Sequence, residues 1–158
     1  MRSGTENVIA LAGLAQAAEE AYELVSEWHQ TSTRQKQLLI QLLESSGLPV
    51  QFNGAVNPED ALPNTLNLSL EGIRGEALAL RLELNHGIQV STGSACSTNK
   101  KHNLSHVLLA MNVSEAGVKG AIRVSFGRYT SDDDVRQLVV AIKQEYSALT
   151  DISGSANH

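Results

Sequence analysis

The residue best suited to nucleophilic chemistry in this chain is Cys96, its only cysteine. It lies in the stretch STGSACS, residues 91–97, where every other side chain is small. Most lone cysteines are small buried hydrophobic residues. Here, however, Ser, Thr, Gly and Asn dominate residues 91–103, which leaves little apolar surface to bury. Two lysines and a histidine follow at residues 100–102, and positive charge favours a thiolate. Two interpretations stand at this point: a buried structural thiol, or a reactive thiol on a polar loop.

Two further residues have side chains suited to binding the anionic groups of a ligand. Arg123 lies in AIRVSF, residues 121–126, where it points away from the apolar positions of an alternating strand. Such an arginine can bind a carboxylate through two parallel hydrogen bonds, or it can simply be solvated. Thr5 lies at a helix start, where its hydroxyl and the free backbone amides suit a phosphate. Ser3 and Glu6 have capping-box spacing, and plain capping is the simpler interpretation of Thr5 alone.

The elements around these residues predict a single domain within the 158-residue chain. Helical periodicity and stop signals predict helices at about residues 5–29, 34–47, 74–87, 104–112 and 131–149. Alternating or short apolar segments predict strands at residues 65–70, 88–90 and 121–126. The domain is expected to span residues 1–150, with a frayed tail at 151–158. The sum is a two-layer α/β (α+β) fold, in which helices cover one face of a small, mostly antiparallel sheet.

Composition restricts the classes of function. Hydrophobic residues make up 42% of the chain and charged residues 18%, as in water-soluble globular proteins. The sequence has neither a long apolar run nor an apolar N-terminal segment, so we expect a cytoplasmic protein without a membrane partner. A net charge of −5 argues against direct binding of nucleic acid. One cysteine forms no internal disulfide and no Cys-based zinc site alone, so no metal is expected.

Five segments follow one another along the chain in this order: RSGTENV, PNTLNLSL, STGSACS, SHVLLAM and IRVSFGRYTSDDDV. Together they resemble the C-terminal part of the pyridoxal-phosphate-dependent cysteine desulfurases, the NifS/IscS-like branch of the class V aminotransferase family. The resemblance extends from Arg2 to about Leu149. It implies the small domain of a fold-type I pyridoxal-phosphate (PLP) enzyme, joined by its long first helix to a large domain. It also implies a homodimer with active sites near the subunit interface.

The resemblance gives each candidate residue a role. Cys96 matches the catalytic cysteine that takes sulfur from L-cysteine as a persulfide, releasing alanine, and passes the sulfur to an acceptor protein. Arg123 matches the arginine that binds the substrate's α-carboxylate. Thr5 matches the threonine that reaches the phosphate of the partner subunit's PLP. Iron–sulfur scaffolds, tRNA-thiolation proteins and DNA-modification proteins are all candidate acceptors.

The chain departs from the family pattern in one large respect. The family's lysine that forms the internal aldimine lies in the large domain, after a serine and a histidine, and none of the five lysines here has that setting. The isolated chain is therefore expected to be inactive and to need a separate large domain. Three interpretations stay open: part of a cysteine desulfurase, a non-catalytic binding or dimerisation module, or a free-standing persulfide carrier.

Overall fold

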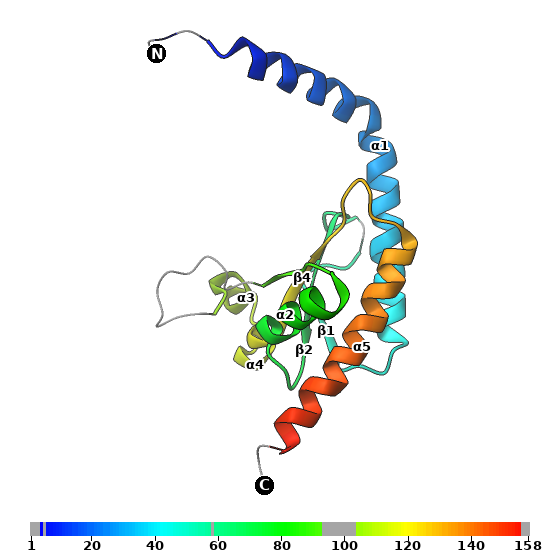
Figure 1. Ribbon diagram of the computed structural model, residues 1–158, viewed down its shortest axis with the longest axis vertical. Helices are drawn as coiled ribbons and strands as arrows, with labels where there is room; N and C mark the ends of the chain where they lie inside the picture. Colours follow the sequence, from blue (N-terminus) through cyan, green and yellow to red (C-terminus); the bar gives the residue numbers. More distant parts are fainter. Residues whose placement is uncertain (1–3, 5, 58, 93–103, 156–158) are drawn as a thin grey trace.

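The computed structural model describes residues 4, 6–57, 59–92 and 104–155. Its elements in chain order are α1 (Val8–Glu44), β1 (Val50–Asn53), β2 (Thr65–Leu70), α2 (Gly75–His86), β3 (Ser91–Thr92), α3 (His106–Ala110), α4 (Glu115–Lys119), β4 (Ala121–Ser125) and α5 (Asp132–Ser155). The strands of the described residues form one antiparallel sheet in the order β1-β2-β4-β3, and β1, β2 and β4 are labelled in Figure 1. The predicted α/β fold with a small antiparallel sheet is confirmed.

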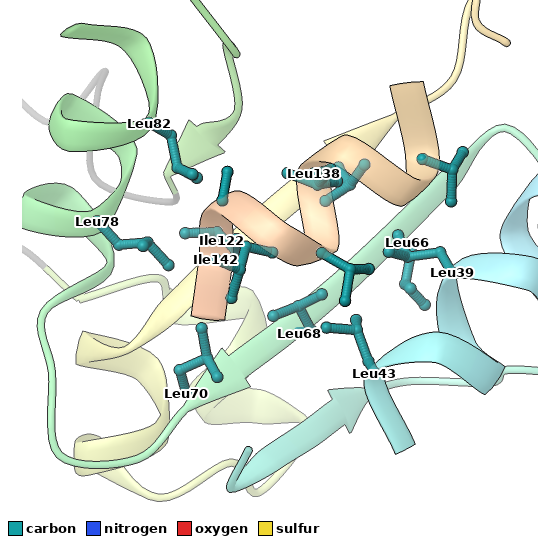
Figure 2. Close-up of a cluster of buried hydrophobic side chains, with 14 of the residues drawn as sticks. Leu39, Leu43, Leu66, Leu68, Leu70, Leu78, Leu82, Ile122, Leu138 and Ile142 are labelled. Carbon is teal, nitrogen blue, oxygen red and sulfur yellow. The ribbon is translucent and has the colours of Figure 1, made fainter. Parts of the chain in front are cut away.

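The main core lies between the sheet and a layer made by α1, α2 and α5 (Figure 2). Leu66, Leu68 and Leu70 alternate along β2 and are 2%, 0% and 0% exposed, as the sequence pattern predicted. The helices contribute side chains that point at this row: Leu39, Leu43, Leu78, Leu82, Leu138 and Ile142. Burial of these leucines therefore determines which face of the sheet the helices cover.

The first helix differs from the prediction. α1 is continuous over 37 residues, whereas the sequence predicted two helices, at about 5–29 and 34–47. The Thr-Ser-Thr run between them has modest helix propensity, which costs only a few tenths of a kcal/mol per residue. Ser32 is buried, and the Thr33 hydroxyl donates to the carbonyl of His29 at 2.8 Å. Packing of the following turns against the core outweighs that cost.

The cap of α1 also differs from the predicted capping box. Asn7 is the N-cap, and its Oδ1 accepts a hydrogen bond from the backbone N–H of Ala10 at 3.0 Å. Asparagine is among the best N-cap residues, and it lies next to the first helical turn. The box predicted at Ser3 and Glu6 therefore does not begin the helix. Thr5, like Ser3, lies outside the described residues.

Among the residues that the structure describes, the opposite face of the sheet is covered only at one end. There α3 and α4 form a small second cluster with Leu108, Val113, Val118 and Ala121. The prediction of helices on a single face is therefore incomplete, because α3, which was predicted as a helix, and α4, which was not, both pack on the other face. The remainder of this face carries polar strand side chains, and no other described element covers it.

Two element boundaries also differ from the prediction. β3 comprises Ser91–Thr92 instead of residues 88–90, and α5 continues to Ser155, into the segment predicted as a tail. β3 is placed by its pairing with β4, in which Ser91 lies opposite Arg123. Sequence pattern alone does not reveal such long-range pairing.

Among the residues described, no helix combines the length and the apolarity that crossing a membrane requires.

Candidate functional site

One polar residue from each strand contributes to a single row across the sheet. The register places Asn53 opposite Asn67, Asn67 opposite Arg123, and Arg123 opposite Ser91. Residues directly opposite one another present their side chains on the same face. We call these four residues the polar row. Because the buried leucines alternate with Asn67 along β2, the polar row lies on the face away from the main core.

Arg123 is exposed at the middle of β4, between two buried neighbours. Ile122 is 0% exposed and Val124 6%. This confirms the predicted orientation of the strand. Arg123 Nη2 donates to Ser91 Oγ at 3.3 Å. Within the described part of the chain no carboxylate pairs with Arg123, so most of its five N–H donors remain for a ligand.

Asn53 fixes the orientation of the side chain next to Arg123. Its Nδ2 donates to Asn67 Oδ1 at 2.8 Å and to Ser69 Oγ at 2.7 Å. Ser69 is 2% exposed, so one end of this network is buried. Asn53 Oδ1 is itself buried and has no hydrogen-bond partner among the described atoms. The row is therefore organised by hydrogen bonds before any ligand arrives.

Among the described strand residues of this face, Arg123 is the charged one. The strand residues in neighbouring rows on the same side are neutral: Gln51, Thr65, Ser69 and Ser125. A single guanidinium among neutral hydrogen-bonding groups suits one anionic group, and a planar carboxylate matches its fork geometry. The face can therefore bind a carboxylate without first breaking an ion pair.

The predicted site residues are only partly placed by the structure. Arg123 is placed, whereas Cys96 and Thr5 lie outside the described residues. The described part of the cysteine segment consists of Ser91 and Thr92, which form β3. Because Ser91 contacts Arg123, the structure brings the beginning of the cysteine segment to the predicted carboxylate-binding residue.

Asn53 and Asn67 were not predicted as site residues. The alternation in TLNLSL placed Asn67 on the polar side of its strand, which was the available signal. Asn53 lies in β1, a strand that the sequence pattern did not predict. Only the strand register shows that both residues share a row with Arg123.

The fold and this face together define a class of protein: an α/β domain of the kind found in fold-type I PLP enzymes. Among solved structures, a NifS-like protein matches with a TM-score of 0.75 and 33% identity, covering 94% of this chain and 36% of that one. The NifS-like protein from Rickettsia africae ESF-5 matches with a TM-score of 0.75 and 29% identity, covering 92% of this chain and 36% of that one.

The sequence comparison specifies the family. The family model described as Aminotransferase class-V matches residues 1–138, so the chain belongs to that family. Cysteine desulfurase IscS 1 of Archaeoglobus fulgidus is 37% identical over 142 residues, which are 88% of this chain and 35% of that protein. Cysteine desulfurase NifS of Azotobacter vinelandii is 33% identical over 154 residues, covering 96% and 37%. The chain thus spans about a third of the length of these curated relatives.

The family depends on PLP, and the described lysines can be compared with that requirement. Lys36 is buried on α1, in the layer over the opposite face of the sheet from Arg123. Its Nζ donates to the carbonyl of Leu62 at 3.0 Å, and burial lowers its pKa. Lys119 and Lys143 are exposed on α4 and α5. The described residues therefore fit a substrate carboxylate, but they do not fit the covalent attachment of PLP in the polar row.

Proposed function

We propose that this chain is the small domain of a PLP-dependent cysteine desulfurase, with Cys96 as its sulfur-accepting thiol. The observation that carries the proposal is the contact between Arg123 and Ser91, at 3.3 Å. It joins an arginine suited to a substrate carboxylate to the first residue of the cysteine segment. Sulfur abstraction from an amino acid requires a group that binds the carboxylate and a thiol close to it. Here the segment that carries the thiol begins beside the carboxylate-binding residue.

The chemistry divides between two residues of this chain. Arg123 binds the α-carboxylate of L-cysteine and fixes the substrate over the sheet. PLP, held by the rest of the enzyme, supplies an electron sink at the substrate's α-carbon. The Cys96 thiolate forms a bond to the substrate's sulfur while the substrate's Cβ–S bond breaks. L-cysteine and a thiol thereby give alanine and a persulfide, and the balance needs no external oxidant.

The persulfide must then reach an acceptor protein. In STGSACS the side chains around Cys96 are all small, so they offer little steric hindrance to an incoming acceptor thiolate. That thiolate attacks the outer sulfur, takes it, and leaves Cys96 as a thiolate again. The proposal does not depend on which sulfur acceptor is used.

The N-terminal half of α1 supports the presence of a further domain. Figure 1 shows this half extending away from the other elements. Its apolar side chains are unusually exposed: Ile9 87%, Leu14 67%, Tyr22 85% and Val25 57%. An apolar surface of this kind is typical of an interface. We propose that a large PLP-binding domain covers it, that Thr5 reaches the cofactor phosphate of the partner subunit in a homodimer, and that the chain alone is inactive.

A chimera tests the proposal. The matching C-terminal third of Archaeoglobus fulgidus IscS 1 is replaced by this chain, and alanine release from L-cysteine is measured. We expect alanine at a rate within about tenfold of the parent enzyme, which corresponds to a loss of at most about 1.4 kcal/mol of transition-state stabilisation. A chimera that binds PLP and releases no alanine would contradict the proposal. Persulfide on Cys96 of the isolated chain, formed from a low-molecular-weight persulfide without PLP, would instead support a free-standing sulfur carrier.

A further inference from the structure

We propose that Asn67 is a second carboxylate-binding residue, whose side-chain amide donates a hydrogen bond to the same substrate carboxylate as Arg123. The inference rests on the proposed function, in which Arg123 binds that carboxylate. It adds a neutral donor at a defined position beside the guanidinium. Together the two residues determine the orientation of the carboxylate as well as its charge.

The first step is the position of Asn67 in the polar row. It lies directly opposite Arg123 across the β2–β4 pair, and directly opposite side chains in an antiparallel pair have Cβ atoms about 5 Å apart. Arg123 Nη2 contacts Ser91 on its other side. A carboxylate bound to the guanidinium from above the sheet is therefore within reach of the Asn67 amide.

The second step is the orientation of the Asn67 amide. Its Oδ1 accepts a hydrogen bond from Asn53 Nδ2 at 2.8 Å, on the β1 side of the row. The nitrogen and oxygen of a planar amide lie on opposite sides of the Cβ–Cγ axis, so Nδ2 is directed away from Asn53. Within the described part of the chain, Asn67 Nδ2 has no hydrogen-bond acceptor. A donor group thus remains on the side of the row where Arg123 lies.

The third step is the reason why the amides take this orientation. If the amide groups of Asn53 and Asn67 were both turned over, Asn53 Oδ1 could accept hydrogen bonds from Asn67 and from Ser69. The two N–H donors of Asn53 Nδ2 would then be buried without acceptors. In the observed arrangement the buried group of this network without a partner among the described atoms is one carbonyl oxygen, Asn53 Oδ1. A buried amide nitrogen with two unsatisfied donors is the more costly alternative. The network therefore favours the arrangement that presents a donor from Asn67.

This arrangement has a consequence for specificity. Arg123 and Asn67 both present N–H donors, and neither presents an acceptor toward the ligand. A free carboxylate accepts from both, whereas a carboxamide would bring its own N–H group against them. The face is therefore expected to select amino acids with a free α-carboxylate over their amides.

A titration of the full chain by NMR tests the inference without PLP. L-alanine, the expected product, is added to ¹⁵N-labelled protein, and the Arg123 Nε–H and Asn67 side-chain NH₂ resonances are followed. We expect both to shift saturably with L-alanine and neither to shift with L-alaninamide. Asn67→Ala should weaken the apparent affinity about tenfold, roughly the worth of one hydrogen bond to a charged group, and the matched control Asn64→Ala should leave it unchanged.

The outcomes separate the two proposals. If the Arg123 resonance shifts while the Asn67 amide does not, and Asn67→Ala binds as tightly as wild type, the inference is overturned and the carboxylate site stands. If neither resonance responds to L-alanine, the carboxylate site and the inference both fail. Should Asn67→Ala not fold, as judged from its backbone amide spectrum, the response of the Asn67 amide in the wild-type chain decides.

Discussion

Replacing Glu145 by glutamine tests whether one buried carboxylate holds α2 against α5. Glu145 lies on α5, is 4% exposed, and accepts hydrogen bonds from three side chains of α2. Arg81 Nε donates to Oε2, while Asn85 Nδ2 and His86 Nε2 each lie 2.8 Å from Oε1. These hydrogen bonds, led by that from Asn85, lower the pKa of Glu145 from 4.5 to about 2, although burial acts in the opposite direction.

The size of the effect follows from this shift. A fall from 4.5 to about 2 corresponds to a stabilisation on the order of 3 kcal/mol for the charged form. The Arg81 side chain is 34% exposed, so solvent screens part of the interaction. We therefore expect Glu145→Gln to lower the free energy of unfolding by about 2 kcal/mol at pH 7, measured by urea denaturation.

The pH dependence has a definite sign. The folded-state pKa lies below the unfolded value, so the stabilisation is complete above about pH 4.5 and is lost as the pH falls toward 2. The difference between wild type and Glu145→Gln should shrink over that interval. Glu44→Gln, at the exposed end of α1, is the control and should behave like wild type. A Glu145→Gln protein as stable as wild type at pH 7, or a difference that does not shrink at low pH, would refute the reasoning.

Three further predictions concern packing and binding. Gly120→Ala should lower the free energy of unfolding by more than about 2 kcal/mol, because a Cβ there would lie 2.2 Å from the carbonyl oxygen of Leu70. Gly13→Ala, whose Cβ would meet nothing within 4 Å on an exposed helix, should raise it by about 0.5–1 kcal/mol, and urea denaturation compares the two. Leu68→Ala should lower the free energy of unfolding by about 3 kcal/mol, because Leu68 is 0% exposed. Leu80→Ala, at a position 56% exposed, should lower it by less than about 1 kcal/mol by the same measurement. Equal losses would contradict the assigned core. In the chimera, Arg123→Ala should raise the KM for L-cysteine about 10- to 100-fold, and an unchanged KM would remove Arg123 from carboxylate binding.

Much of the fold follows from local pattern, and the site does not. The alternation in TLNLSL and AIRVSF identified β2 and β4 and placed Arg123 on the polar face, because strands half-buried on one side carry a period of two. Helix propensity and Gly87, which has a φ of 67°, identified α2 and its C-terminus. β1 and α4 are four and five residues long and were not identified, because each offers too few positions for a clear hydrophobic period.

The polar row could not be predicted because it depends on strand register. Asn53 and Ser91 are distant from Arg123 in sequence. They join the row only through the strand pairs β1–β2, β2–β4 and β3–β4. A slip of one residue in either pair would move them to the core face. The candidate residues were therefore recognisable from motif order, whereas the contacts that orient them required the structure.

The most direct test of the central claim is mass spectrometry of the PLP-loaded chimera after incubation with L-cysteine. We expect the peptide that contains Cys96 to gain the mass of one sulfur atom, and the gain to be reversed by a reducing thiol. The Cys96→Ser chimera should bind PLP as before and should neither gain sulfur nor release alanine. Alanine release that continues in the Cys96→Ser chimera, or that occurs without any sulfur on Cys96, would contradict the account.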